Sequence, residues 1–93
     1  MKLIWTTKFW CSACNKDVPG RVYSPIGDRD DLSEEEKNEA VEWLQHYHAR
    51  DVHTNCHLCG RNIKPHEEFD ILWNEQESVW KNICLECGKK NVK

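Results

Sequence analysis

The six cysteines of this 93-residue chain all fall into C-x-x-C pairs, which constrains the fold more than any other feature. The first, second and third pairs are Cys11–Cys14, Cys56–Cys59 and Cys84–Cys87. Each pair is followed by a residue that tolerates a left-handed backbone: Asn15, Gly60 or Gly88. A sharp turn at such a residue directs both sulfurs of a pair to one side. Each pair is therefore expected to supply two ligands to a metal ion.

Disulfide bonds are the competing interpretation of these cysteines. Residues 1–8 do not have the pattern of a secretory signal, and no segment approaches the roughly 20 apolar residues of a membrane span. We therefore expect a cytoplasmic protein without membrane association. In that compartment, spaced C-x-x-C pairs are typical of metal sites rather than disulfides.

The composition leaves room for only a modest core, with 39% hydrophobic and 31% charged residues. Chains of this size are marginally stable by apolar burial alone and often depend on a metal. We expect a small α+β metal-stabilised domain, built from zinc knuckles with short β-hairpins and one central α-helix. Residues 1–55 are expected to hold a knuckle hairpin and the helix, and residues 56–93 a four-cysteine zinc finger.

The local pattern predicts short strands around one helix. The expected elements are a strand at 3–10, a turn at 18–20, a return strand at 21–23, a loop at 24–28, a helix from 34 to near Arg50, and strands at 69–73 and 78–83 around a turn at 74–77. Ser33 can cap the helix, and Glu36 completes a capping box. Its apolar face carries Ala40, Val41, Leu44, Tyr47 and His48 at helical spacing.

The second and third pairs form the strongest candidate site: Cys56, Cys59, Cys84 and Cys87. Two such pairs with 24 residues between them resemble four-cysteine zinc sites, in which two facing turns complete a tetrahedron. Residues 56–88 are similar to a treble-clef finger if the third pair opens a short helix, and to a zinc ribbon if no helix follows. Treble-clef nucleases of the HNH type need an acidic residue and a histidine on the hairpin, and residues 70–74 offer no such pair.

The first pair, Cys11 and Cys14, needs two more ligands. His48 and His53 fit the H-x(3–5)-H spacing of zinc sites, and His48 lies on the apolar face of the helix. His46, His57 and His66 are rival donors. With this second site, the chain is expected to bind two Zn²⁺ ions.

The order of the ligands along the whole chain also resembles RING and LIM domains. In a cross-brace of that kind, the first pair shares a metal with the second pair, while His48 or Asp51 joins His53 and the third pair. The third ligand of a RING is normally cysteine, and no cysteine stands between residues 15 and 55. We therefore favour sequential pairing over the cross-brace.

The charge balance and the closed sites bear on function. Thirteen basic and 16 acidic residues give a net charge of −3, whereas nucleic-acid binders normally carry a basic patch. Four protein ligands leave a metal no open position for chemistry, so no enzyme activity and no small-molecule substrate is expected. The favoured hypothesis is a structural zinc module that binds a protein partner, with Trp73 or Trp80 partly exposed as an anchor.

Three alternatives stay open. Lys8, Lys16, Arg21 and the lysine-rich residues 89–93 would serve a nucleic-acid-binding zinc finger protein. The second and third pairs around an acidic, aromatic segment resemble rubredoxin, an iron electron carrier, although Leu85 stands where rubredoxin normally has proline. The RING-like ligand order implies a ubiquitin-ligase module.

Overall fold

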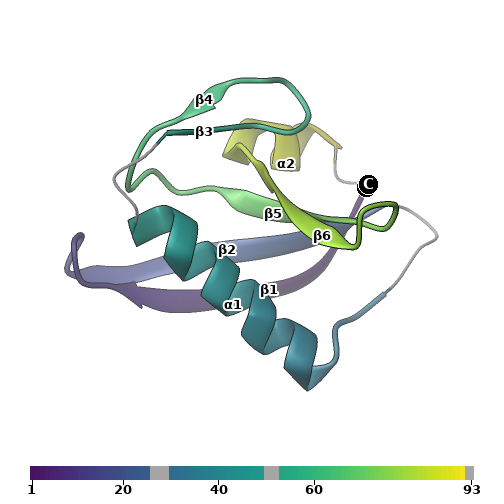
Figure 1. Cartoon of the computed structure of the whole chain (residues 1–93), viewed down its shortest axis with the longest axis horizontal. Helices are drawn as coiled ribbons and strands as arrows, with labels where there is room; N and C mark the ends of the chain where they lie inside the picture. The colour runs from purple at the N-terminus through teal and green to yellow at the C-terminus, as the bar shows by residue number, and fades with distance from the viewer. Residues whose placement is uncertain (26–29, 50–52, 92–93) are drawn as a thin grey trace.

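The computed structural model describes residues 1–25, 30–49 and 53–91 and has an α+β architecture (Figure 1). In chain order, its elements are β1 (Lys2–Cys11), β2 (Lys16–Ser24), α1 (Glu34–Ala49), β3 (Thr54–Asn55), β4 (Asn62–Ile63), β5 (Asp70–Asn74), β6 (Val79–Ile83) and α2 (Leu85–Asn91). Neither helix within these ranges is long and apolar enough to cross a membrane.

A four-stranded sheet with the order β1-β2-β5-β6 organises the molecule. The β1–β2 and β5–β6 pairs are antiparallel, whereas β2 and β5 run parallel, with Val22 beside Ile71 and Tyr23 beside Leu72. The short strands β3 and β4 form a separate antiparallel ribbon. The larger sheet therefore contains strands from both sides of the boundary expected at residue 55.

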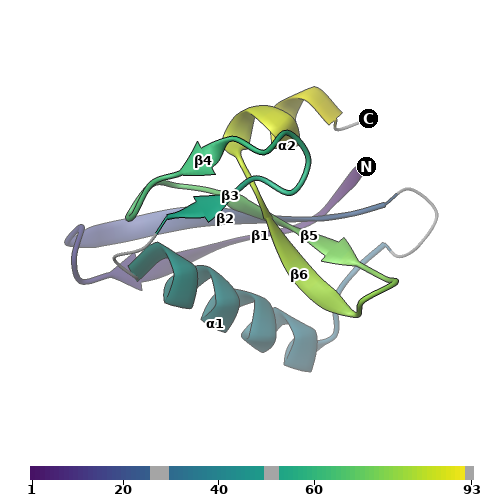
Figure 2. The same ribbon diagram turned by 45° about the horizontal axis from the view of Figure 1, so that its top comes forward.

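The two helices lie on opposite sides of this sheet, as Figure 2 shows. Gly20 in β2 faces α1 so closely that an added Cβ would lie 2.6 Å from a methyl carbon of Leu44. On the other side, a Cβ on Gly88 of α2 would lie 2.9 Å from a carboxylate oxygen of Asp70 and 3.0 Å from the hydroxyl of Tyr23. Both glycines are thus needed for close packing of a helix against the sheet.

The β1–β2 hairpin corrects the expected turn at residues 18–20. Those residues lie inside β2, where Val18 pairs with Phe9 and Pro19 with Lys8. The chain reverses at residues 12–15 instead, and Asn15 adopts a left-handed backbone with φ of 55°. Pro19 precedes the part of β2 that pairs with β5, so on that side its missing N–H breaks no ladder bond.

The α1 helix agrees with the sequence prediction at its N-terminus and along its buried face. Its capping box is confirmed: the Glu36 N–H donates to Ser33 Oγ at 3.2 Å, and the Ser33 N–H donates to Glu36 Oε1 at 3.0 Å. The residues that it buries are Ala40, Leu44 and His48. The predicted end near Arg50 lies outside the described residues, as do Asp51, Lys93 and most of the loop predicted at 24–28.

The β5–β6 hairpin is close to its predicted position, and Trp73 lies directly opposite Trp80. Their ring centroids are 4.9 Å apart. Trp80 is buried and Trp73 is half-buried, with its Nε1–H donating to Glu75. The expected count of one helix is corrected by α2, which begins directly after Cys84.

Candidate metal centres

The four-cysteine cluster consists of Cys56, Cys59, Cys84 and Cys87, whose sulfurs all lie within 4.8 Å of one another. The Sγ atoms of Cys59 and Cys84 are 3.8 Å apart. Sulfurs bound at about 2.3 Å around one tetrahedral zinc are separated by about 3.8 Å. The spacing therefore suits a metal ion of that size, and is too long for a disulfide bond.

Two turns hold the sulfurs of this cluster in place. In the first turn, the Gly60 N–H donates to the carbonyl of Cys56 at 2.9 Å, and Gly60 has φ of 77°. The His57 N–H donates to the carbonyl of Asn82 at 2.8 Å, which fixes this turn against β6. Cys84 lies between β6 and α2, and Cys87 lies in the first turn of α2. The short helix thus presents the third pair to the second.

The pKa values of the thiols reflect their crowding. Burial alone would raise the pKa of Cys56, but backbone N–H groups of Cys84, Cys59 and Leu58 and a hydrogen bond with Cys59 lower it to about 6. Burial raises the pKa of Cys87, and hydrogen bonds with the thiols of its neighbours raise it further. One thiolate forms readily, but four cannot coexist at this distance without a cation between them.

Arg61 and Glu67 lie beside this cluster. The carboxylate of Glu67, 3.0 Å from the Arg61 guanidinium, raises the pKa of Arg61, as does a hydrogen bond from the guanidinium to the sulfur of Cys84. Glu67 Oε1 also accepts a hydrogen bond from the Lys64 N–H at 3.1 Å. A positive group thus lies against a site that would carry excess negative charge once its cysteines ionise.

The Cys₂His₂ cluster consists of Cys11, Cys14, His48 and His66, again with donor atoms within 4.8 Å of one another. The Cys14 N–H donates to the sulfur of Cys11 at 3.4 Å, and the sulfur of Cys14 lies 3.3 Å from Nε2 of His48. The donors come from the end of β1 and the turn after it, the last turn of α1 and the loop between β4 and β5. Three distant parts of the chain therefore meet at this point.

His48 is oriented for metal binding. Its Nδ1 lies 3.3 Å from the backbone carbonyl of Glu67, which can only accept, so Nδ1 carries the proton. The lone pair of Nε2 is then directed at Cys14, as in metal-bound histidines held by an outer carbonyl. Burial lowers the pKa of His48, which is 1% exposed, and so favours the neutral form that binds metals.

The surroundings of the His66 side chain are the strongest local indication of a metal site. Its Nδ1 is buried, and among the described residues no hydrogen-bond partner for it is found. Its backbone lies in the left-handed region, with φ of 62°, a conformation that costs free energy for a residue with a side chain. The ring of His66 thus lies beside two thiols and an imidazole, on strained backbone, with one nitrogen unpaired. These properties are those expected of a metal ligand.

The structure places His53 elsewhere. Its ring is exposed, and its Nδ1 lies 2.7 Å from the side-chain oxygen of Asn62 across the β3–β4 ribbon. His66 stands where His53 was expected, because the loop after β4 returns over the end of α1. His46 and His57 are exposed and outside both clusters. No local signal separates His66 from its rivals, since H-x(3–5)-H spacing describes ligands on one continuous segment.

The grouping of the cysteines is sequential, with the second pair facing the third and not the first. The left-handed residue expected after each pair is found at Asn15 and Gly60. Gly88 differs because it lies inside α2, where it donates a helical hydrogen bond to Cys84, and serves close packing instead.

Fold and donors together define a small α+β protein with two Cys/His clusters, each of which could hold one metal ion. Comparison with family models, with curated proteins and with solved structures found no match.

Proposed function

We propose that this chain is a non-enzymatic zinc module that folds around two Zn²⁺ ions and binds a protein partner. The observation that carries the proposal is the presence of two clusters with four sulfur and nitrogen donors each. Structural zinc is held by four such ligands in a tetrahedron, whereas catalytic zinc keeps one position for water. The four sulfur and nitrogen donors of each cluster would fill all four positions of a tetrahedral zinc ion.

The donor types favour zinc over other metals. Four thiolates suit zinc or iron, while two thiolates with two imidazoles suit zinc. The buried Nδ1 of His66 and the neutral ring of His48 match nitrogen ligation at the second cluster. Because the Cys₂His₂ cluster would be neutral around Zn²⁺, burial of its ligands carries little electrostatic penalty.

Metal stoichiometry tests this proposal. Native mass spectrometry of protein purified under reducing conditions is expected to give two zinc ions per chain. Replacing zinc by Co²⁺ should give separate absorption bands for four-sulfur and two-sulfur coordination. His66→Ala should remove only the two-sulfur bands, with His53→Ala as the matched control that keeps both sets.

Other stoichiometries would contradict the proposal. A single iron with a reversible redox wave would favour an electron carrier with four cysteines. Protein that carries no metal, with a mass two hydrogens lower for each cysteine pair, would favour disulfide bonds. Micromolar binding of RNA or DNA at physiological salt that is lost on replacing Lys89 and Lys90 would favour a nucleic-acid partner.

A further inference from the structure

The outer edge of β6 borders a groove. In the sheet order β1-β2-β5-β6, no strand of residues 1–25, 30–49 or 53–91 pairs with this edge. The groove has a volume of about 430 Å³ and lies between α1, the β3 region and β6; its lining includes Trp43, Tyr47, Thr54, His57, Val79 and Trp80. We call it the β6 groove.

The backbone of Trp80 faces this groove. The carbonyl of Asn82 accepts from the His57 N–H, so Asn82 directs its backbone groups away from β5. Residues of an antiparallel strand alternate between facing their partner strand and facing outward. Trp80, two residues earlier, therefore also directs its N–H and C=O outward, where an added strand can pair with them.

The helix wall of the groove is aromatic and fixed in position. The indole N–H of Trp43 donates to the side-chain oxygen of Asn82 at 2.8 Å, which ties α1 to β6. The Trp43 and Tyr47 rings lie with their centroids 4.7 Å apart. Both side chains are half-buried, so their remaining faces are open to a ligand. Pre-ordered aromatic side chains of this kind lower the entropy cost of binding.

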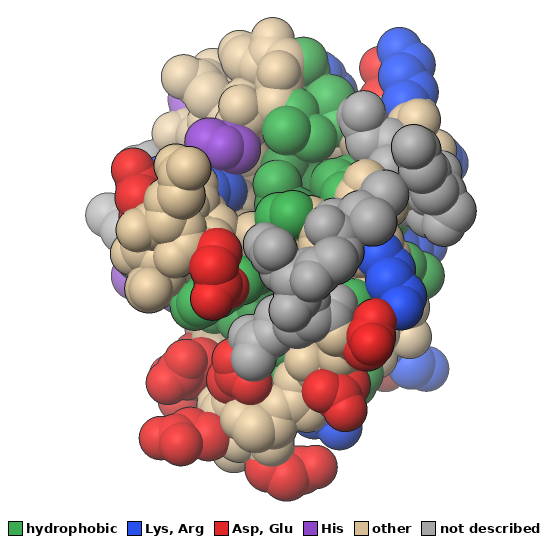
Figure 3. Space-filling view, turned by 90° about the vertical axis from the view of Figure 1, so that its right-hand side faces the viewer, with side chains coloured by type: hydrophobic (Ala, Val, Ile, Leu, Met, Phe, Trp, Pro, Cys, Tyr) green, Lys and Arg blue, Asp and Glu red, His purple; other side chains and the backbone are tan. Residues whose placement is uncertain are grey.

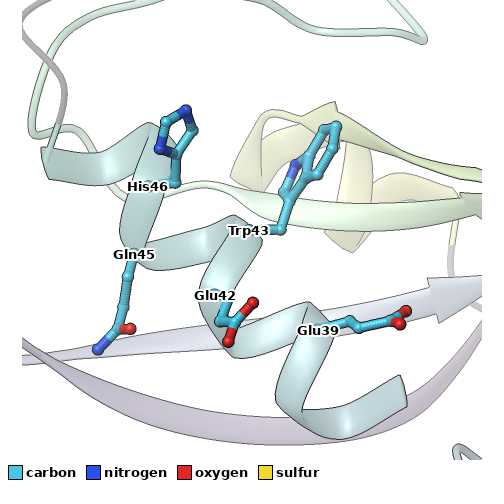
Figure 4. Close-up of a pocket in the computed structure, with 5 residues that line it drawn as sticks. All are labelled: Glu39, Glu42, Trp43, Gln45 and His46. Atoms are coloured by element: carbon cyan, nitrogen blue, oxygen red, sulfur yellow. The ribbon is translucent and has the colours of Figure 1, made fainter. Parts of the chain in front are cut away.

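Carboxylates border the same wall. A neighbouring hollow of about 510 Å³ shares Trp43 and is lined by Glu39, Glu42, Gln45 and His46. In Figure 4, Trp43 and His46 rise from one side of α1, while Gln45 points the other way. Figure 3 shows that acidic side chains gather toward the end of the molecule where α1 begins. Lys81, which also lines the groove, is paired with Glu77.

We propose that the β6 groove binds an extended segment of a partner protein that carries lysine or arginine among apolar residues. The segment adds a strand beside Trp80, packs an apolar side chain against Trp43 and directs a cationic side chain to Glu39 and Glu42. This inference rests on the proposed function and specifies the residue types of the partner segment. The acidic wall repels phosphate, and a helical ligand would leave the backbone groups of Trp80 unpaired.

A random eight-residue peptide library displayed on phage provides the probe, with zinc-loaded protein as the target. We expect enriched peptides to alternate apolar residues with lysine or arginine. A synthetic enriched peptide should shift the NMR signals of the Trp43 indole and the Trp80 amide. Methylating alternate backbone nitrogens of that peptide should weaken binding by about tenfold or more, because strand pairing is blocked.

Matched variants test the charge component. Glu39→Gln with Glu42→Gln should weaken binding roughly three- to tenfold and flatten its salt dependence. The control, Asp17→Asn with Asp31→Asn, changes net charge equally at exposed positions outside the groove and should leave binding unchanged. Equal effects of the two double variants would overturn the proposed cationic recognition.

Other outcomes separate this inference from the proposed function. Enrichment of acidic peptides, no enrichment, or pairing of two copies of the chain at β6 would overturn the groove proposal. Peptides that map to exposed Trp10 instead would also overturn it, while a protein-binding module would stand. Zinc content, measured on the same sample by native mass spectrometry, decides the metal proposal independently of any peptide.

Discussion

The two metal-ligand clusters of this protein are built in different ways. The four-cysteine cluster takes all its donors from residues 56–87, where two turns are joined through the β5–β6 hairpin. The Cys₂His₂ cluster collects donors from β1–β2, α1 and the β4–β5 loop, up to 55 residues apart between Cys11 and His66. A cluster of the first kind can be identified from spacing, whereas the second depends on how the whole chain folds back on itself.

The same difference affects stability. Loss of the four-cysteine cluster removes the connection between the turn after β3 and the start of α2, whereas the Cys₂His₂ cluster connects α1 to an extensive β1–β2 hairpin. Glu67 contacts both sites: its carbonyl accepts from His48, and its carboxylate holds Arg61, which contacts Cys84. Two independent clusters would lose their metal ions separately on substitution, whereas coupled clusters would lose both together.

The largest effect is expected for Cys84→Ser. The variant should lose metal at the four-cysteine cluster and unfold, since structural zinc contributes about 10–16 kcal/mol of apparent binding free energy, similar to the total stability of a small domain. Circular dichroism and native mass spectrometry provide the measurements. As a comparison, Cys11→Ser should lose one zinc and keep the four-cysteine cluster loaded. Loss of both zinc ions in Cys11→Ser would mean that the clusters form only together.

His66→Ala tests the donor that the tertiary structure supplies. Metal affinity at the Cys₂His₂ cluster should fall by more than about a hundredfold, beyond the 10–100-fold effect of outer-shell residues. Chelator competition with Co²⁺-loaded protein measures this affinity. His53→Ala is the matched control and should change stability by less than about 0.5 kcal/mol, because its ring is exposed. A larger effect for His53 than for His66 would show that the two histidines exchange roles.

Substitution of Asp70 tests how a buried carboxyl group beside α2 affects stability. Burial raises the pKa of Asp70 to about 6, even though the Arg21 side chain and N–H and the Tyr23 hydroxyl favour its charged form. The pKa of an aspartate in the unfolded chain is about 3.9, so ionisation of Asp70 destabilises the folded protein. This destabilisation is absent below about pH 4 and fully developed above about pH 6. Asp70→Asn should therefore stabilise the protein by on the order of 2–3 kcal/mol above pH 6.

Urea unfolding of Asp70→Asn and its parent between pH 5 and pH 8 measures that difference. The comparison isolates the carboxyl group, because the two proteins differ only at residue 70 and have the same candidate metal ligands. Asp17→Asn, at an exposed position, serves as the control with no pH-dependent difference expected. A stabilisation that stays constant across the range would show that ionisation of Asp70 is not its cause.

The smallest effect is expected for Glu67→Gln. The change removes the charge that holds Arg61 near Cys84 and should weaken the four-cysteine cluster about tenfold, as outer-shell substitutions do. The Cys₂His₂ cluster should be unaffected, because His48 donates to the backbone carbonyl of residue 67. Cobalt titration resolves the two sites by their absorption. If both sites weaken equally, the side chain acts by ordering the whole 64–67 loop.

The local features of this protein are determined by sequence alone. The turns after Cys14 and Cys59, the capping box at Ser33 and the β5–β6 hairpin each depend on residues a few positions apart. Within such a distance, backbone propensity and short hydrogen bonds decide the conformation, and both can be derived from the order of residue types. The four cysteines of residues 56–87 come together for the same reason.

The tertiary structure decided what depends on distant partners. Val18-Pro19-Gly20 has turn-like residues but lies in a strand, because Phe9 and Lys8 offer it a partner strand. His66 replaces His53 because the parallel pairing of β2 with β5 carries the preceding loop over the end of α1. That pairing forms through burial of side chains that are far apart in the sequence. Residue spacing along the chain does not predict such contacts.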